Sequence, residues 1–156
     1  MKKALLVLIL VSFSGCTTIS TTNYIAANHP YERKFLKSYD ETLEAINKIL
    51  VKDGWQIDGT SSPTVFERQA QDGVDTKSLV VFTKVRKSSW LLFSTYTHLN
   101  VFIYSKNDES EVEIRYASIV SWPFKQFHRC RNDGLTDRLF RYLETELALK
   151  YSATSR

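Results

Sequence analysis

The sequence predicts one α+β domain of two layers, in which helices pack on one face of an antiparallel sheet of about four strands. Three observations support this prediction. An amphipathic helical pattern comes first, a region of alternating apolar residues follows, and a second amphipathic helical pattern closes the chain. We expect the domain over residues 30–150, followed by a frayed tail at 151–156.

The first fifteen residues have the three parts of a secretory signal peptide. Two lysines give a basic start, residues 4–13 are largely apolar, and Ser14 and Gly15 are small. Ten helical residues extend about 15 Å, roughly half the hydrocarbon thickness of a bilayer, which is too short for a stable transmembrane helix. The alternative, a buried strand of the mature domain, would leave two lysines at its start without turn residues. We therefore expect residues 1–15 to be a signal peptide.

Residues 13–16, Phe-Ser-Gly-Cys, resemble the lipobox of bacterial lipoproteins. In that class cleavage falls before the cysteine, so the resemblance implies a diacylglycerol on the thiol of Cys16 and a fatty acyl chain, such as palmitate, on its amine. Two or more chains anchor a protein stably in a membrane. Thr17 follows, where an aspartate tends to retain lipoproteins in the inner membrane. The resemblance therefore implies the periplasmic face of the outer membrane, with the inner membrane as the alternative.

Residues 16–29 are small, polar and almost uncharged, which predicts a lipidated, flexible tether. Because the signal peptide removes two lysines, the mature chain is nearly balanced in charge. That balance and a periplasmic location exclude nucleic acid as a natural partner. Of the two cysteines, Cys16 is assigned to the lipid, and Cys130 is left without an intramolecular partner. We expect Cys130 to be buried, because its neighbours are aromatic and aliphatic, and the alternative is a disulfide to another chain.

The first helix is predicted over residues 38–53. Ser38 and Glu41 have the spacing of a capping box, in which the two side chains satisfy backbone N–H groups of the first turn. Gly54 is well placed to end the helix in a left-handed conformation. One apolar stripe follows the helical period, and it consists of Tyr39, Leu43, Ile46 and Leu50.

The region between the helices alternates in the way that strands do. Glu111, Glu113 and Arg115 alternate with apolar residues, which predicts a strand with a charged, solvent-facing side. A polar turn at 106–110 joins this strand to the one before it, so the two form a hairpin. The strands are expected at 64–68, 79–86, 90–105 and 111–118.

The end of the domain is predicted to be helical. Pro123 permits a helical start, with a turn or two at 124–128, and Asp133-Gly134 interrupts this segment. An apolar stripe then predicts the closing helix over residues 135–150.

The first helix and its exit carry a second resemblance. The opening Tyr39-Asp40-Glu41 with Ala45-Ile46, and the exit Gly54-Trp55 with Ile57, resemble small periplasmic lipoproteins of the helix-grip kind, similar to domains of the BamC lipoprotein. This likeness covers residues 38–148. It implies a helix-grip fold, and its motifs are mostly core and cap positions.

No motif for catalysis, metal or cofactor binding is present, so we expect no enzyme and no cofactor. The histidines at 29, 98 and 128 are scattered, without the clustered spacing of metal ligands. Cys130 lies beside a histidine, but neighbouring residues of a helix point apart. Glu111 and Glu113 would lie about 7 Å apart on one strand face, a spacing that glycan-cleaving enzymes use. A solvated sheet face explains these carboxylates better.

One segment is predicted to make contacts. Lys84, Arg86 and Lys87 form a basic cluster that runs into an apolar segment containing Trp90 and Leu92. Basic side chains bind phosphate headgroups, and tryptophan prefers the membrane interface. With Phe102 on the same predicted strand, these residues are candidates for an exposed membrane or partner contact. The sequence alone slightly favours the alternative, a basic turn between two core strands.

These features predict a lipid-anchored, non-enzymatic accessory or binding module of an envelope assembly, with the membrane and an envelope protein as partners. The first alternative is a carrier or sensor of a hydrophobic ligand or lipid held between helix and sheet, because the chain has eight tyrosines and nine phenylalanines. An envelope hydrolase is a third, least favoured alternative.

Overall fold

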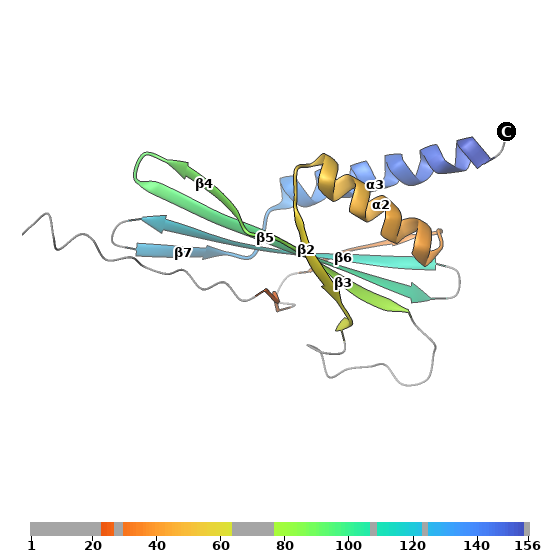
Figure 1. Ribbon diagram of the computed structural model, residues 1–156, viewed down its shortest axis with the longest axis horizontal. Helices are drawn as coiled ribbons and strands as arrows, with labels where there is room; N and C mark the ends of the chain where they lie inside the picture. Colours follow the sequence, from red (N-terminus) through yellow and green to blue (C-terminus); the bar gives the residue numbers. More distant parts are fainter. Residues whose placement is uncertain (1–22, 27–29, 64–76, 107–108, 123–124, 155–156) are drawn as a thin grey trace, which may run out of the picture.

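The computed structural model describes residues 23–26, 30–63, 77–106, 109–122 and 125–154. In these ranges two helices pack on one face of a seven-stranded antiparallel sheet, which confirms the α+β class but corrects the expected four or so strands to seven (Figure 1). The elements in chain order are β1 (Tyr31–Phe35), α2 (Tyr39–Lys52), β2 (Ile57–Ser61), β3 (Ser78–Thr83), β4 (Arg86–Trp90), β5 (Phe93–Lys106), β6 (Glu109–Trp122), β7 (Lys125–Arg129) and α3 (Asp133–Thr154).

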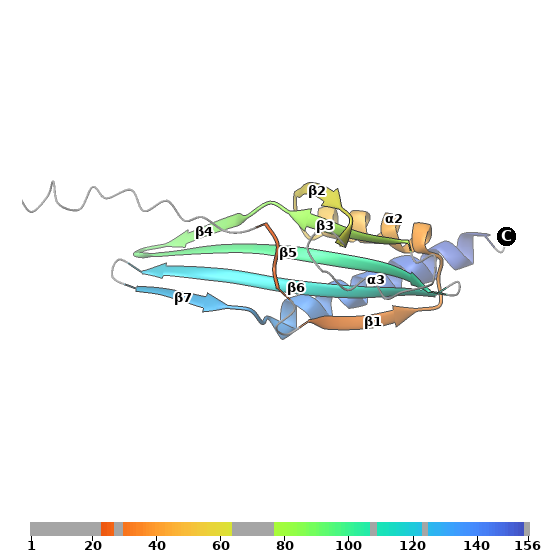
Figure 2. The ribbon, with the colours of Figure 1, turned by 90° about the horizontal axis from the view of Figure 1, so that it is seen from below.

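The long hairpin of β5 and β6 is the centre of the sheet (Figure 2). At one end of the hairpin the strand order is β1-β6-β5-β3-β2, and the two helices cover this end. At the other end β4 pairs with β5 and β7 pairs with β6. The sheet therefore continues beyond the helices as the four strands β4-β5-β6-β7.

Helix α2 begins and ends as the sequence predicts. Ser38 and Glu41 form the capping box, with the hydroxyl of Ser38 accepting the N–H of Glu41. At the other end Gly54 has a φ of +80°, and its N–H donates to the carbonyl of Val51 at 2.9 Å. The helix buries one face in the core. Its buried apolar residues are Ala45, Ile46, Ile49 and Leu50.

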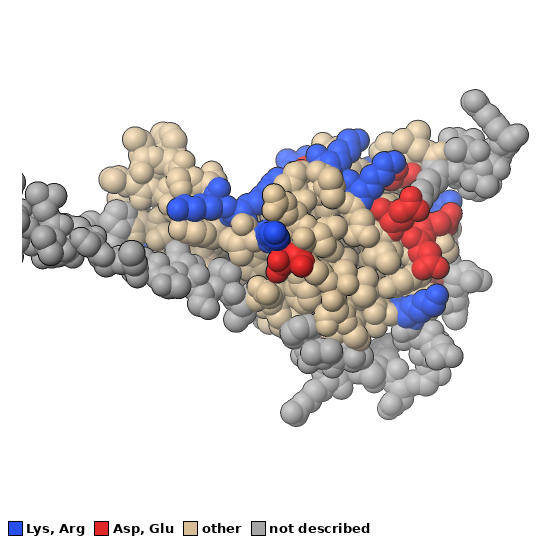
Figure 3. Space-filling view, viewed as in Figure 1, with Lys and Arg blue, Asp and Glu red and all other residues tan. Residues whose placement is uncertain are grey.

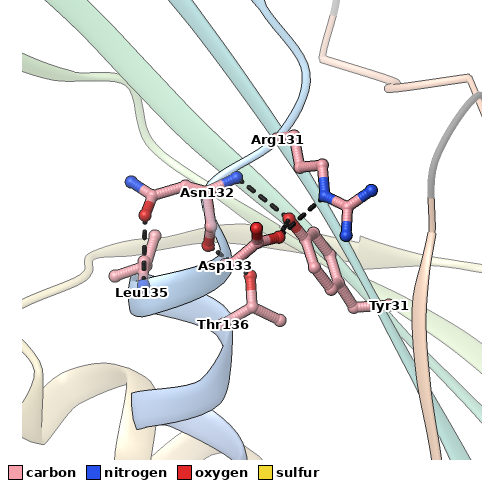
Figure 4. Close-up of polar contacts among 6 residues, drawn as sticks. All are labelled: Tyr31, Arg131, Asn132, Asp133, Leu135 and Thr136. Atoms are coloured by element: carbon pink, nitrogen blue, oxygen red, sulfur yellow. Dashed lines mark hydrogen bonds and ion pairs between the residues drawn. The ribbon is translucent and has the colours of Figure 1, made fainter.

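Helix α3 is longer than predicted, and a polar cluster fixes its start (Figure 4). Asn132 caps the helix through its side-chain oxygen, which accepts the N–H of Leu135 at 3.1 Å. The hydroxyl of Tyr31 accepts the N–H of Asn132 and donates to the carboxylate of Asp133. Arg131 Nε donates to the same carboxylate at 2.7 Å. The cluster thus ties β1 to the first turn of α3.

These contacts shift the pKa values of the cluster in opposite directions. The hydrogen bond from Arg131 is the main reason that the pKa of Asp133 is lowered from 3.8. Desolvation, and then the hydrogen bond to Asp133, raise the pKa of Tyr31 above 10.0.

At its other end α3 runs to Thr154, so residues 151–154 are helical and not the frayed tail that the sequence predicts.

The main core lies between the helices and the sheet. β5 and β6 contribute alternate residues of one parity, and α3 contributes Leu139, Phe140, Leu143 and Leu147. Central positions such as Leu99, Ile103 and Val112 have no exposed surface. This packing places the apolar parity of the 111–118 segment toward the helices, as its alternation predicts.

The opposite face of the sheet is covered at its centre, contrary to the sequence prediction. Glu113 and Arg115 were expected to face solvent, but their exposed fractions are 6% and 3%. They pair with each other, and the guanidinium of Arg115 lies 3.9 Å from the centre of the Phe102 ring. Residues 23–26, named here the outer strap, lie over them.

Hydrogen bonds and ring contacts hold the outer strap on the sheet. The N–H of Ile25 donates to the side-chain oxygen of Asn100 at 2.6 Å, and Arg115 donates to the carbonyl of Ile25 at 3.0 Å. Arg115 also donates to the hydroxyl of Tyr24, whose ring packs edge-on against Phe102. The expectation of a flexible tether over 16–29 therefore does not hold for residues 23–26.

Two other predicted segments and one predicted burial differ from the structure. The predicted strand 90–105 is broken by a turn at Leu91 and Leu92, so its first residue belongs to β4. The helical turn expected after Pro123 is the strand β7 instead. Cys130 is exposed, not buried. The strand expected at 64–68 lies outside the described residues, and β2 is the strand that follows α2.

Candidate functional site

The four-stranded end of the sheet, named here the extension, carries a row of aromatic rings that are exposed or half-buried. The rings lie on the face of the sheet that the helices cover elsewhere. Phe93 and Trp122 have the parity of the core residues of β5 and β6, and the other two rings lie opposite residues of that parity on the neighbouring strands. The ring centres of Trp90 and Phe93 are 6.4 Å apart, and those of Phe93 and Trp122 are 4.3 Å apart. Phe127 lies opposite Val120 on the same face. We name Trp90, Phe93, Trp122 and Phe127 the aromatic platform.

A two-residue turn closes the β4–β5 hairpin and ends the extension. Leu91 and Leu92, named here the hairpin tip, lie between the paired residues Trp90 and Phe93. Leu91 is 83% exposed and Leu92 is 68% exposed, beside a tryptophan that is 71% exposed. Leu91 also has a φ of 50°, in the left-handed region that glycine and asparagine adopt most easily. Neither burial in the core nor turn geometry explains a leucine at this position.

The extension is basic as well as apolar. Residues 84–97 and 118–131 contain six Lys or Arg residues and no Asp or Glu. Lys87 lies 5.7 Å from the centre of the Tyr96 ring, and Lys125 lies 5.1 Å from that of Phe127. On the face that Figure 3 shows, the end of the extension is uncharged, and Lys and Arg side chains lie between it and the helical part. The arrangement is an apolar end with a basic border.

The structure brings together some of the predicted contact residues. Trp90 and Leu92 are exposed at the end of the extension, and Lys84 and Lys87 are exposed along β4 and just before it. Arg86 instead has a structural contact: its guanidinium lies 4.1 Å from the centre of the Trp55 ring and donates to the carbonyl of Asp53.

Phe102 has to be removed from the predicted contact surface. It has no exposed area, and it lies on the opposite face of the sheet beneath the outer strap. The sequence predicts otherwise because its apolar residues continue through the hairpin tip, so Trp90 and Phe102 fall on one predicted strand. The lipidation site predicted at Cys16 lies outside the described residues.

Several residues of the extension were missed by the sequence reasoning. The missed members are Leu91, Phe93, Trp122, Lys125 and Phe127. The spacing of Trp122 and Phe127 around Pro123 could have indicated a hairpin. A helix was predicted there because proline also begins helices.

Two kinds of site considered from the sequence, a metal site and a carboxylate pair, can be checked against the described residues. Within the ranges that the structure describes, no group of three His, Cys, Asp or Glu side chains is placed to hold a metal ion. Of the two carboxylates considered for glycan cleavage, Glu113 is buried against Arg115. Among the described helices, neither α2 nor α3 has a stretch long and apolar enough to cross a bilayer.

Comparison of the chain with protein-family models gives no match, and comparison with curated proteins gives none either. The function is therefore inferred from the chain's own residues.

Proposed function

We propose that this protein is a non-enzymatic binding module of the bacterial envelope, anchored by lipid at Cys16 to the periplasmic face of the outer membrane. The extension is its contact surface, and an envelope protein is its expected partner. The observation that carries the proposal is the aromatic platform, which is an apolar sheet face without the helical cover that the rest of that face has.

The platform has the composition of a binding surface. Aromatic residues are enriched at the centres of protein interfaces, and large exposed apolar patches in soluble domains mark interaction sites. Trp122 is 41% exposed and Phe127 is 46% exposed, although both belong to a well-paired sheet. The signal-like start and the lipobox-like residues 13–16 support the location.

The packing of the described core favours a binding module over a carrier of a hydrophobic ligand. The helices and the sheet meet through side chains that fill the layer between them, and most of these have exposed fractions of 4% or less. A carrier would need a cavity of several hundred Å³ there. The aromatic residues that suggested a carrier are divided among this core, the outer face and the platform.

The lipid anchor is tested by fractionating cells that produce the wild-type chain or Cys16→Ser. The wild type is expected in the outer membrane with the mass of an acylated cysteine, and the serine variant is expected to lose both the acyl mass and the membrane fraction. Unchanged fractionation and mass in the serine variant would contradict the anchor.

The contact surface is tested by photocrosslinking in intact cells. A photoreactive amino acid replaces Trp122 on the platform in one strain, and Leu149, an exposed position on α3, in the control strain. We expect a defined protein adduct from position 122 and not from position 149. Equal adducts from both positions, or none from position 122, would contradict the assigned surface.

A further inference from the structure

We propose that the hairpin tip inserts into the interface of a bilayer that contains anionic lipid, the same bilayer that holds the anchor. The rest of the aromatic platform, which consists of Phe93, Trp122 and Phe127, is then left beside the membrane surface, free for its partner. This inference rests on the proposed anchor at Cys16, and it adds a second, direct contact between the folded domain and the lipid.

The hairpin tip has the chemistry of a membrane-inserting loop. Leu91 and Leu92 are largely exposed, and no polar residue separates them from Trp90. Tryptophan prefers the level of the headgroups, where its ring has one apolar and one polar environment. A leucine at a φ of 50° is less favourable for folding than glycine would be. Insertion into lipid gives this side chain a use that the fold does not.

The charge of the extension complements an anionic surface. The six Lys and Arg residues of segments 84–97 and 118–131 have no acidic neighbour within those segments. Arg86 and Arg131 are engaged with the carbonyl of Asp53 and the carboxylate of Asp133, respectively. Of the other four, Lys125 lies opposite Trp122 at the end of the extension and Lys87 lies on β4, where phosphate headgroups would meet them.

The docked outer strap limits how far the domain can move from its anchor. Cys16 precedes Ile25 by nine residues, which span at most about 30 Å. Ile25 is bonded to Asn100 in β5, and Phe93, at the tip end of that strand, is seven residues away, or about 25 Å. These two lengths are similar. The tip can therefore reach the surface that the anchor enters.

The test uses the full-length lipidated protein reconstituted into vesicles of phosphatidylethanolamine with phosphatidylglycerol. A fluorescent label is attached to Leu92→Cys in a Cys130→Ser background, because Cys130 is exposed. The matched control carries the label at Leu149→Cys on α3. Quenching by lipids brominated along the acyl chain reports insertion, and flotation of the vesicles reports the anchor.

We expect strong quenching at position 92 and none at position 149. Lys87→Gln is expected to lower the ratio of inserted to aqueous tip about fivefold on these vesicles. On phosphatidylcholine vesicles it should change little. Leu91→Gly is expected to lower the ratio about tenfold or more while raising the stability of the fold, a combination that a merely structural leucine would not give.

Three results would overturn the inference. A floating protein whose label at position 92 stays in water excludes insertion while leaving the anchor intact. A label at position 92 that is shielded from water in native membranes but exposed to water on lipid vesicles assigns the tip to a protein partner instead. A protein that does not float removes the anchor, and with it the common bilayer on which the inference depends.

Discussion

Replacing Arg115 with methionine is expected to destabilise the domain by about 3–5 kcal/mol and to release the outer strap. Arg115 is 3% exposed, and its guanidinium donates to the carboxylate of Glu113, to the hydroxyl of Tyr24 and to the carbonyl of Ile25. Methionine keeps the apolar contact with the sheet but removes all three hydrogen bonds. The carboxylate of Glu113 is then buried without its positive partner, which is the main cost.

The assay is urea unfolding of the variant and of a matched surface control, Arg33→Met. Arg33 also pairs with a glutamate, Glu144, at 2.7 Å, but both side chains are substantially exposed. The control is therefore expected to lose about 1 kcal/mol or less. The double variant Glu113→Leu with Arg115→Met should recover most of the loss, because it leaves no buried charge unpaired.

Amide hydrogen exchange at Ile25 gives a second measurement that does not depend on global unfolding. Its N–H is bonded to Asn100 in the wild type, so release of the strap should raise its exchange rate before the core amides change. The reasoning is refuted if Arg115→Met loses no more stability than Arg33→Met. It is also refuted if exchange at Ile25 is unaltered.

Three further predictions concern the folded domain. Phe102→Ala should cost about 3–5 kcal/mol in urea unfolding, whereas Trp90→Ala should change stability by less than about 1 kcal/mol, because only the first ring is buried; equal losses would contradict the assignment of the two faces. Gly54→Ala should lower the thermal midpoint, since its φ is +80° and the added Cβ would lie 2.8 Å from the nearest side-chain nitrogen, and an unchanged midpoint would count against this cap. Because the pKa of Asp133 is lowered in the folded state, its contribution to stability is complete above about pH 3.8 and is lost as the pH falls through the lowered value. Arg131→Gln should bring the pKa of Asp133, measured by carbon NMR, back toward 3.8. An unchanged pKa would contradict the pairing of Arg131 with Asp133.

The helices and the central hairpin could be predicted because their signals are local. Ser38, Glu41 and Gly54 specify the two ends of α2 by side-chain and backbone chemistry that acts within a few residues. The alternation of residues 111–118 likewise places the apolar parity of β6 in the core. Both patterns reflect contacts that a helix end or a half-buried strand makes in any fold.

The burial of the sheet face opposite the helices could not be predicted. The alternation of residues shows which side of a strand is polar, but it does not show whether another segment covers that side. Glu113 and Arg115 look like solvent-facing residues until a segment about ninety residues earlier in the chain is placed over them. That segment, residues 23–26, has no charge or periodicity that would indicate docking. A pair of opposite charges two residues apart on one strand is compatible with either environment.

The candidate site was only partly predicted, because its turn has unusual residues. Two-residue hairpin turns usually contain glycine, asparagine or aspartate, whereas the turn between β4 and β5 consists of Leu91 and Leu92. The same apolar residues that make the tip conspicuous in the structure made it look like the interior of a strand. Lys87 and Trp90 were found because a basic cluster beside a tryptophan is visible without knowledge of the turn.

The continuity of β5 and β6 has a mechanical consequence. The two strands pair without interruption from Ser94 and Ser121 at one end to Lys106 and Glu109 at the other, a ladder of about 40 Å. Bending the extension relative to the part of the sheet under the helices would strain the hydrogen bonds of that ladder, so the sheet is stiff along its length. Whatever holds the extension therefore also fixes the direction in which α2 and α3 point.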